Sequence, residues 1–252
     1  MNDLKYNKIK TKINFNNLKF KKELGSGAFG SVYEAFNGKT TNKRMVVKKT
    51  RKTVGLQLFS LLVNGKFQGT MFDKEVDALK YLSKQGIAPK IYYSNKEKMV
   101  YVIEKLDSTL FELLEKGVFN NNNLKELTST LKKLQKTPFI HNDLHDSNIM
   151  YSSKSKKFYV IDWGIFKLDK KCPYPKSKSK IKSKSKKCYE FKKSNILALE
   201  NLFYYLITNK KKKFTEKNKK EFLDLFGLKN LDQAKEIINY WYLIIINYVL
   251  RI

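Results

Sequence analysis

A cluster of glycines near the start of the chain constrains its fold more than any other feature. The segment reads Gly25-Ser26-Gly27-Ala28-Phe29-Gly30-Ser31-Val32. Glycines allow backbone N–H groups to approach phosphate oxygens where a Cβ would clash, so this segment is a candidate phosphate loop. A dinucleotide-binding fold needs a helix after such glycines, whereas Ser31–Phe36 has the composition of a strand. On this motif alone, a hairpin whose glycines only form the turn stays open as an alternative.

The apolar pattern around and after the glycines predicts an α+β architecture. Short runs rich in Val, Tyr and Phe over Phe20–Lys49 predict an antiparallel meander, and the helical spacing over Phe72–Lys84 predicts a helix. Two apolar runs, Lys90–Tyr93 and Met99–Ile103, flank a polar turn and predict a hairpin. Beyond Glu104 the spacing becomes helical. We therefore expect a small antiparallel β lobe with one helix, followed by a larger, mostly α lobe.

The larger lobe is expected to contain several helices. Leucines recur at helical spacing in two groups between Leu110 and Leu134, and apolar residues do so again over Ile196–Ile207 and Leu231–Leu250. The last apolar run, Tyr240–Ile252, is too short to span a membrane and is interrupted by polar residues. We expect a buried terminal helix there and no transmembrane segment.

One loop of the predicted larger lobe indicates chemistry most clearly. It reads His141-Asn142-Asp143-Leu144-His145-Asp146-Ser147-Asn148. An Asp and an Asn in one loop can present one base and one metal ligand. Further along, the apolar run Phe158–Ile161 ends in Asp162, which is either a cap of the strand or a second oxygen ligand for a hard cation at a triphosphate.

Lys48 differs from the many other lysines because it ends an apolar strand, Met45–Lys48. A lysine in so basic a chain is usually a solvated charge, so a role for Lys48 depends on a partner carboxylate. Glu75 lies early on the predicted helix, beside its apolar stripe, and is the expected partner. A surface glutamate is the alternative for that position.

These motifs, in this order over Phe20–Gly164, resemble those of the protein kinase superfamily: G-x-G-x-x-G-x-V, V-A-I-K, H-R-D-L-x-x-x-N and D-F-G. The resemblance implies a two-lobed fold that binds ATP and Mg²⁺ between its lobes. It implies that Asp143 and Lys48 are catalytic and that Asn148 and Asp162 hold the metal. The residues that it assigns to ATP binding are Leu24, Gly25, Ser26, Gly27, Ala28, Phe29, Gly30, Val32, Lys48 and Glu75.

Several positions depart from the common kinase pattern. His145 stands where serine/threonine kinases usually have lysine, and this form resembles divergent kinases and small-molecule phosphotransferases. Asn142 replaces the arginine that pairs with a phosphorylated activation loop, so we expect no regulation by that route. No A-P-E sequence follows Gly164, and residues 54–70 form an insertion with no assigned role.

Three functions therefore stay open. The first is a serine/threonine protein kinase that transfers the γ-phosphoryl group of ATP to a protein hydroxyl. The second is a kinase of small metabolites, and the third is a basic pseudokinase that only binds acidic partners or nucleic acid. The net charge of +29 attracts acidic proteins and nucleic acid alike, although a compositional bias of the genome would also produce it. The intact Lys48, Asp143 and Asp162 favour an enzyme.

The domain organisation follows the same resemblance. We expect residues 1–19 to be an N-terminal extension, 20–104 the N-lobe and 105–252 the C-lobe. Alternating Lys and Ser over 170–187 predicts an insert without fixed structure. Two cysteines without a disulfide framework, and an N-terminus without a secretory signal, predict an intracellular protein. The lysine- and asparagine-rich composition would suit a virus or an AT-rich microbe.

Overall fold

The computed structural model describes residues 18–27, 30–37, 40–51, 70–168, 191–209 and 214–249. The chain divides into two compact units. One holds the chain up to Lys84 together with Ala88–Lys105, and the other holds Gln85–Ile87 and the chain from Leu106 onward. The predicted Lys/Ser insert, most of the predicted N-terminal extension and all but Thr70 of the insertion lie outside the described residues.

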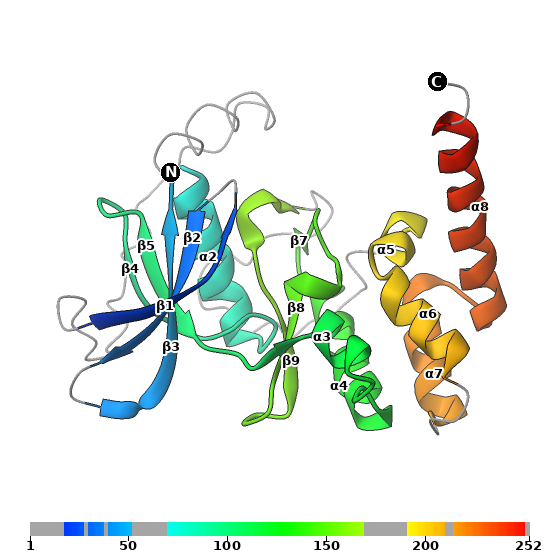
Figure 1. Cartoon of the computed structure of the whole chain (residues 1–252), viewed down its shortest axis with the longest axis horizontal. Coiled ribbons are helices and arrows are strands. Elements are labelled where there is room, and N and C mark those ends of the chain that lie inside the picture. The colour runs from blue at the N-terminus through cyan, green and yellow to red at the C-terminus, as the bar shows by residue number, and fades with distance from the viewer. Residues whose placement is uncertain are drawn as a thin grey trace. The chain divides into compact units, whose positions relative to one another are not determined.

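The first unit is built on one antiparallel sheet (Figure 1). Its strands span Leu18–Gly27 (β1), Gly30–Asn37 (β2), Thr40–Thr50 (β3), Ile91–Asn95 (β4) and Val100–Glu104 (β5). They lie in the order β1-β2-β3-β5-β4, which confirms the predicted meander and hairpin. On β3, Met45 and Val47 are fully buried in one apolar cluster, so the alternating Val46 and Lys48 project from the opposite face.

Helix α2 (Met71–Lys84) lies in the same unit and forms where the sequence predicts it. Its start is capped by a reciprocal pair, because the Asp73 N–H donates to the Thr70 hydroxyl and the Thr70 N–H donates to the Asp73 carboxylate. The apolar stripe of the helix is buried at Phe72, Val76 and Leu79. Glu75 lies beside this stripe and is buried with it.

The second unit combines short strands with helices. The strands are Ser108–Thr109 (β6), Phe139–Ile140 (β7), Ile149–Ser152 (β8), Lys157–Val160 (β9) and Lys167–Leu168 (β10), in the orders β6-β8-β9 and β10-β7. The helices are Leu110–Glu115 (α3), Asn121–Leu134 (α4), Lys193–Ala198 (α5), Glu200–Thr208 (α6), Glu216–Leu223 (α7) and Leu231–Val249 (α8). Three 3₁₀ turns span Asp146–Asn148 (η2), Trp163–Ile165 (η3) and Asp224–Phe226 (η4).

Two expectations for the helices were wrong. The helix predicted over Ile196–Ile207 is split, because Leu199 adopts a non-helical backbone (φ −110°, ψ 28°) between α5 and α6. The expected burial of the terminal helix fails over Tyr240–Ile244, since Tyr240 is 64% exposed and Leu243 59%. An apolar helix is buried only where other elements cover it, and the apolar pattern alone does not say which do. No helix in the described ranges is long and apolar enough to cross a bilayer.

Candidate active site

A row of side chains crosses three strands of the first unit. The register pairs Val32 on β2 with Lys48 on β3, and Lys48 with Tyr101 on β5. Directly opposed residues of an antiparallel pair project from the same face, so these three side chains are neighbours on the face opposite the Met45–Val47 cluster. Val46 is buried on that face, so the Lys48 side chain projects beside an apolar neighbour.

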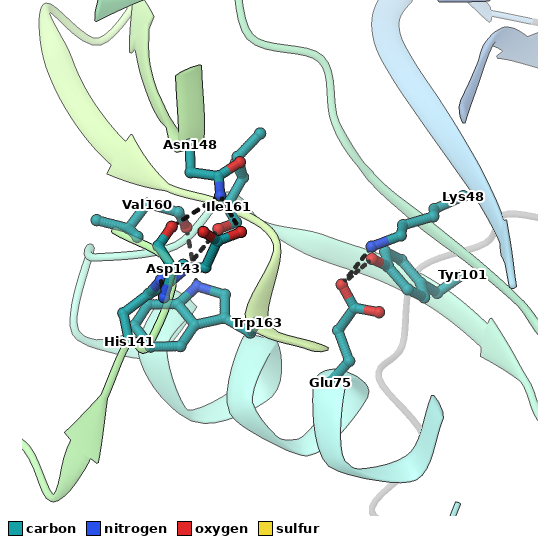
Figure 2. A network of polar contacts seen from close by, with 9 residues as sticks. All are labelled: Lys48, Glu75, Tyr101, His141, Asp143, Asn148, Val160, Ile161 and Trp163. Carbon is teal, nitrogen blue, oxygen red and sulfur yellow. Dashed lines mark hydrogen bonds and ion pairs between the residues drawn. The ribbon is translucent and has the colours of Figure 1, made fainter. Parts of the chain in front are cut away.

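Glu75 on α2 contacts two side chains of this row, Lys48 and Tyr101. The Nζ of Lys48 lies 2.7 Å from Oε1 of Glu75, and the Tyr101 hydroxyl donates to the same oxygen at 2.7 Å (Figure 2). The side chain of Glu75 is 3% exposed and that of Lys48 13%. A buried carboxylate is tolerated only when charged or polar donors meet it, and here it has both. The expected ion pair is formed, with Tyr101 as an additional donor.

The glycine-rich segment joins β1 to β2 by a tight ladder. Its register pairs Gly25 with Val32, Ser26 with Ser31, and Gly27 with Gly30. Leu24, just before it, is 46% exposed, and Ala28 and Phe29 at the tip lie outside the described residues. A Cβ on Gly30 would lie 2.2 Å from the backbone oxygen of Lys49, whereas a Cβ on Gly25 would meet nothing within 4 Å. Glycine at position 30 is thus required by the close approach of β2 and β3.

We predict that Gly30→Ala lowers the free energy of unfolding by about 1–3 kcal/mol, because the backbone of β3 must move to admit the methyl group. Gly25→Ala is the matched control and should leave stability within about 0.5 kcal/mol of the parent. Urea unfolding monitored by circular dichroism measures both. Equal destabilisation by the two changes would contradict the packing described for Gly30.

In the second unit, His141 connects the loop after β7 to the chain after β9. Its Nε2 lies 2.8 Å from the Ile161 carbonyl oxygen, and its Nδ1 accepts from the Asp143 N–H at 3.2 Å. Burial lowers the pKa of His141. The neutral ring with hydrogen on Nε2 satisfies both contacts, because a proton on Nδ1 would face the N–H of Asp143. Trp163 packs edge-on at 4.5 Å between ring centroids and donates its indole N–H to the Val160 oxygen.

Asn148 orients Asp143 from the other side of the loop. Its amide nitrogen donates to the backbone oxygen of Asp143 at 2.9 Å and to Oδ2 at 3.3 Å (Figure 2). Asn148 is 8% exposed, whereas the side chain of Asp143 is 51% exposed. The loop therefore holds a carboxylate in a fixed position and leaves it accessible to a solute.

Strand pairing places the residue before Asp162 beside Asn148. The Ile161 N–H donates to the Asn148 carbonyl at 2.9 Å, which continues the β8–β9 ladder up to the residue before Asp162. Asp162 itself has φ 58° and ψ 64°, a left-handed conformation that non-glycine residues seldom adopt and that clusters at functional sites. Because Asn148 uses its amide nitrogen on Asp143, its amide oxygen is the atom left to present to a ligand. A carboxylate and an amide oxygen are donors that Mg²⁺ prefers, so the two residues fit this metal.

A family model described as protein kinase domain matches residues 18–222. The chain belongs to the protein kinase domain family. It is 32% identical over 158 residues to myosin light chain kinase A of Dictyostelium discoideum, an alignment that covers 59% of this chain and 50% of the relative. It is 28% identical over 156 residues to the probable serine/threonine-protein kinase FPV212 of fowlpox virus, covering 57% of this chain and 51% of the relative.

A solved structure, the Cydia pomonella granulovirus kinase PK-1, matches at 21% identity with a TM-score of 0.43, covering 62% of this chain and 54% of that chain. This kinase domain spans about half the length, or less, of the curated relatives that it matches.

The two unusual residues of the kinase loop both have local contacts. Asn142 donates from its side chain to the Ile165 carbonyl at 2.7 Å. His145 accepts the Ser147 N–H on Nδ1 at 3.3 Å, and its Nε2 lies 3.7 Å from Oδ2 of Asp143. Asn142 thus ties the loop to η3, and His145 bonds within the loop itself.

Asp146 is a buried acid of the kinase loop for which the motifs predict no role. Asn201 on α6 donates to its Oδ2 at 3.1 Å, while Oδ1 is buried without a hydrogen-bond partner. Burial raises the pKa of Asp146 from 3.8 to about 7, with a smaller contribution from the charge of Glu200. The folded state therefore holds a proton here that the unfolded chain releases at lower pH.

The raised pKa of Asp146 makes the stability of the fold depend on pH. Asp146 stabilises the fold fully below its unfolded pKa of 3.8, and this contribution is lost as pH rises to about 7. We predict that the free energy of unfolding of the parent, minus that of Asp146→Asn, falls by on the order of 3 kcal/mol over this window. Urea unfolding without Mg²⁺ at several pH values measures it, and the subtraction removes the opposite effect of His141. A pH-independent difference would contradict the burial of this carboxyl group.

Sequence reasoning missed three contributors to the site. Tyr101 looked like one more apolar residue of a strand, and only the register shows it opposite Lys48. Trp163 stands at the middle position of the D-F-G-like segment, but its contact with His141 depends on the turn after β9. Asn201 is distant in sequence from Asp146, and no local signal connects the two.

Proposed function

We propose that this kinase domain is an active serine/threonine protein kinase, which transfers the γ-phosphoryl group of ATP to a protein hydroxyl. The observation that carries the proposal is Asp143, a half-exposed carboxylate held in place by Asn148 and by the loop that His141 fixes. Family membership and the serine/threonine kinases among the relatives support the substrate class. The net charge of +29 favours acidic protein substrates. We place this activity inside a cell.

In the proposed reaction, the substrate oxygen attacks the γ-phosphorus while the bond to the β–γ bridging oxygen breaks and ADP leaves. Asp143 accepts the hydroxyl proton on a carboxylate oxygen and later releases it to solvent. Lys48, held by Glu75 and Tyr101, offsets the charge of the α and β phosphates. The backbone N–H groups of residues 25–30 hold phosphate oxygens, and Val32 packs against the adenine.

Asn148 and Asp162 are proposed to hold Mg²⁺, which offsets phosphate charge when bound. Their unit supplies the metal ligands and Asp143, while the other unit supplies Lys48 and the glycine-rich segment. We propose that residues 20–104 form an N-lobe and residues 105–252 a C-lobe. Positioning of the reactants would then account for most of the catalysis.

Transfer of radiolabelled phosphate tests this function directly. The chain is incubated with γ-labelled ATP, Mg²⁺, a mixture of acidic and basic proteins and a set of small hydroxylated metabolites, and the labelled proteins are hydrolysed to identify the phosphoamino acids. Phosphoserine or phosphothreonine is the expected product. Label found only in small hydroxylated metabolites, or no Mg²⁺-ATP-dependent thermal shift at all, would reject the proposal.

A further inference from the structure

The Tyr101 hydroxyl and the Lys48 ammonium group converge on one oxygen of Glu75. Both lie 2.7 Å from Oε1, and the register places Tyr101 on β5 directly opposite Lys48 on β3 (Figure 2). Tyr101 is 2% exposed and the Glu75 side chain 3%, so solvent has little access to this oxygen. Hydrogen bonds to a charged group are strong where solvent does not screen them. A change in one of the two donors therefore alters how the carboxylate holds the other.

The ring that carries the Tyr101 hydroxyl is held by packing. Its centroid lies 6.1 Å from that of Phe72 on α2, with an angle of 45° between the ring planes. Phe72 and Glu75 are three positions apart on α2, and side chains at this spacing are neighbours on one face of a helix. Because the phenol oxygen is fixed to its ring, the packed ring holds the hydroxyl in place against Glu75.

Helix α2 has other attachments that do not involve this hydroxyl. The Nζ of Lys96, in the turn between β4 and β5, lies 2.8 Å from Oδ2 of Asp73 in the first turn of α2. The helix also packs against β4, and its apolar stripe is buried. We therefore expect α2 to keep its place without the Tyr101 hydroxyl, whose particular contribution is to the carboxylate of Glu75.

We propose that Tyr101 is a positioning residue for ATP binding, because its hydroxyl holds the Glu75 carboxylate in the orientation that presents Lys48 to the phosphates. The inference rests on the proposed function, in which Lys48 offsets the charge of the α and β phosphates. A lysine ammonium group has three N–H donors, so a contact with Oε1 is compatible with donation to a phosphate. Tyr101 acts through Glu75 and does not itself contact the nucleotide.

Loss of the hydroxyl would change Lys48 in two ways. The carboxylate of Glu75 would lose a donor that offsets part of its charge, so it would draw the Lys48 ammonium group more strongly to itself. It would also lose the contact that fixes its orientation, so Lys48 would be held less precisely. Both changes leave Lys48 less available to a phosphate, and both weaken ATP binding.

The affinity of the full chain for a non-hydrolysable ATP analogue with Mg²⁺, measured by isothermal titration calorimetry, tests this role. Tyr101→Phe keeps the ring, removes only the hydroxyl and should raise Kd about tenfold, the effect of one hydrogen bond to a charged group. Tyr205→Phe is the matched control, because the buried Tyr205 hydroxyl donates to the Phe119 carbonyl at 3.1 Å in the other unit. Both variants should unfold at lower urea concentration than the parent, but Tyr205→Phe should keep the parent Kd.

A double variant separates positioning from a general loss of packing. Since the hydroxyl acts through the carboxylate, Tyr101→Phe/Glu75→Gln should have a Kd within about twofold of that of Glu75→Gln alone. This comparison also serves if Tyr101→Phe does not fold, because in the Gln background no buried negative charge loses its donor. An unchanged Kd in Tyr101→Phe, or a further tenfold loss in the double variant, would overturn the role of Tyr101. A parent that binds no nucleotide would instead overturn the proposed function, and this inference with it.

Discussion

Replacing Asp143 by Asn should lower kcat for phosphoryl transfer by about 10³-fold, within the usual range of 10² to 10⁴ for a general base. The amide keeps the shape of the side chain and its contact with Asn148, but it no longer accepts the proton of the substrate hydroxyl. ATP binding should change little, because this carboxylate acts on the other reactant. Initial rates with labelled ATP and a protein substrate measure the effect.

Asp224→Asn is the matched control for that experiment, since Asp224 is an exposed acid in the same unit outside the loop. It should retain the parent rate. If Asp143→Asn transferred phosphate at the parent rate, while both variants kept the Mg²⁺-ATP thermal shift, Asp143 would have no role in the proposed mechanism.

Replacing Lys48 by Met should cost both stability and activity. It leaves Glu75 buried with Tyr101 as its remaining described donor, and loss of one partner of a buried ion pair typically costs about 3 kcal/mol. Adding Glu75→Gln removes the uncompensated charge, so Lys48→Met/Glu75→Gln should recover most of the lost stability. Phosphoryl transfer should stay low in both, since neither offers a cation to the phosphates.

The pair Lys132–Glu221 provides the control, because both side chains are 42% exposed. Lys132→Met should leave the free energy of unfolding close to that of the parent and leave transfer unchanged. Urea unfolding and transfer rates are measured on the same preparations. If the double variant regained transfer along with stability, Lys48 would be a structural residue rather than one that contacts phosphate.

The local patterns of the chain were enough to predict most of the elements. The apolar run that ends at Lys48 and the three-and-four-residue spacing of apolar side chains in α2 placed Lys48 and Glu75 on elements that do meet. These predictions succeeded because each depends on a pattern that lies within a single strand, helix or loop.

What the sequence could not predict depends on distant packing. The left-handed backbone of Asp162 follows from the surrounding turn and not from its own residue type. The raised pKa of Asp146 follows from its burial in the folded chain, which no local pattern indicates. The exposure of Tyr240–Ile244 depends on which elements lie beside α8, and their apolar sequence predicted burial.

A crystal structure of the chain with Mg²⁺ and a non-hydrolysable ATP analogue tests the central claim most directly. The account predicts Lys48 Nζ on the α and β phosphates of the bound nucleotide, and Asn148 and Asp162 on its metal. A nucleotide bound without Lys48, or a metal held away from Asp162, would contradict it.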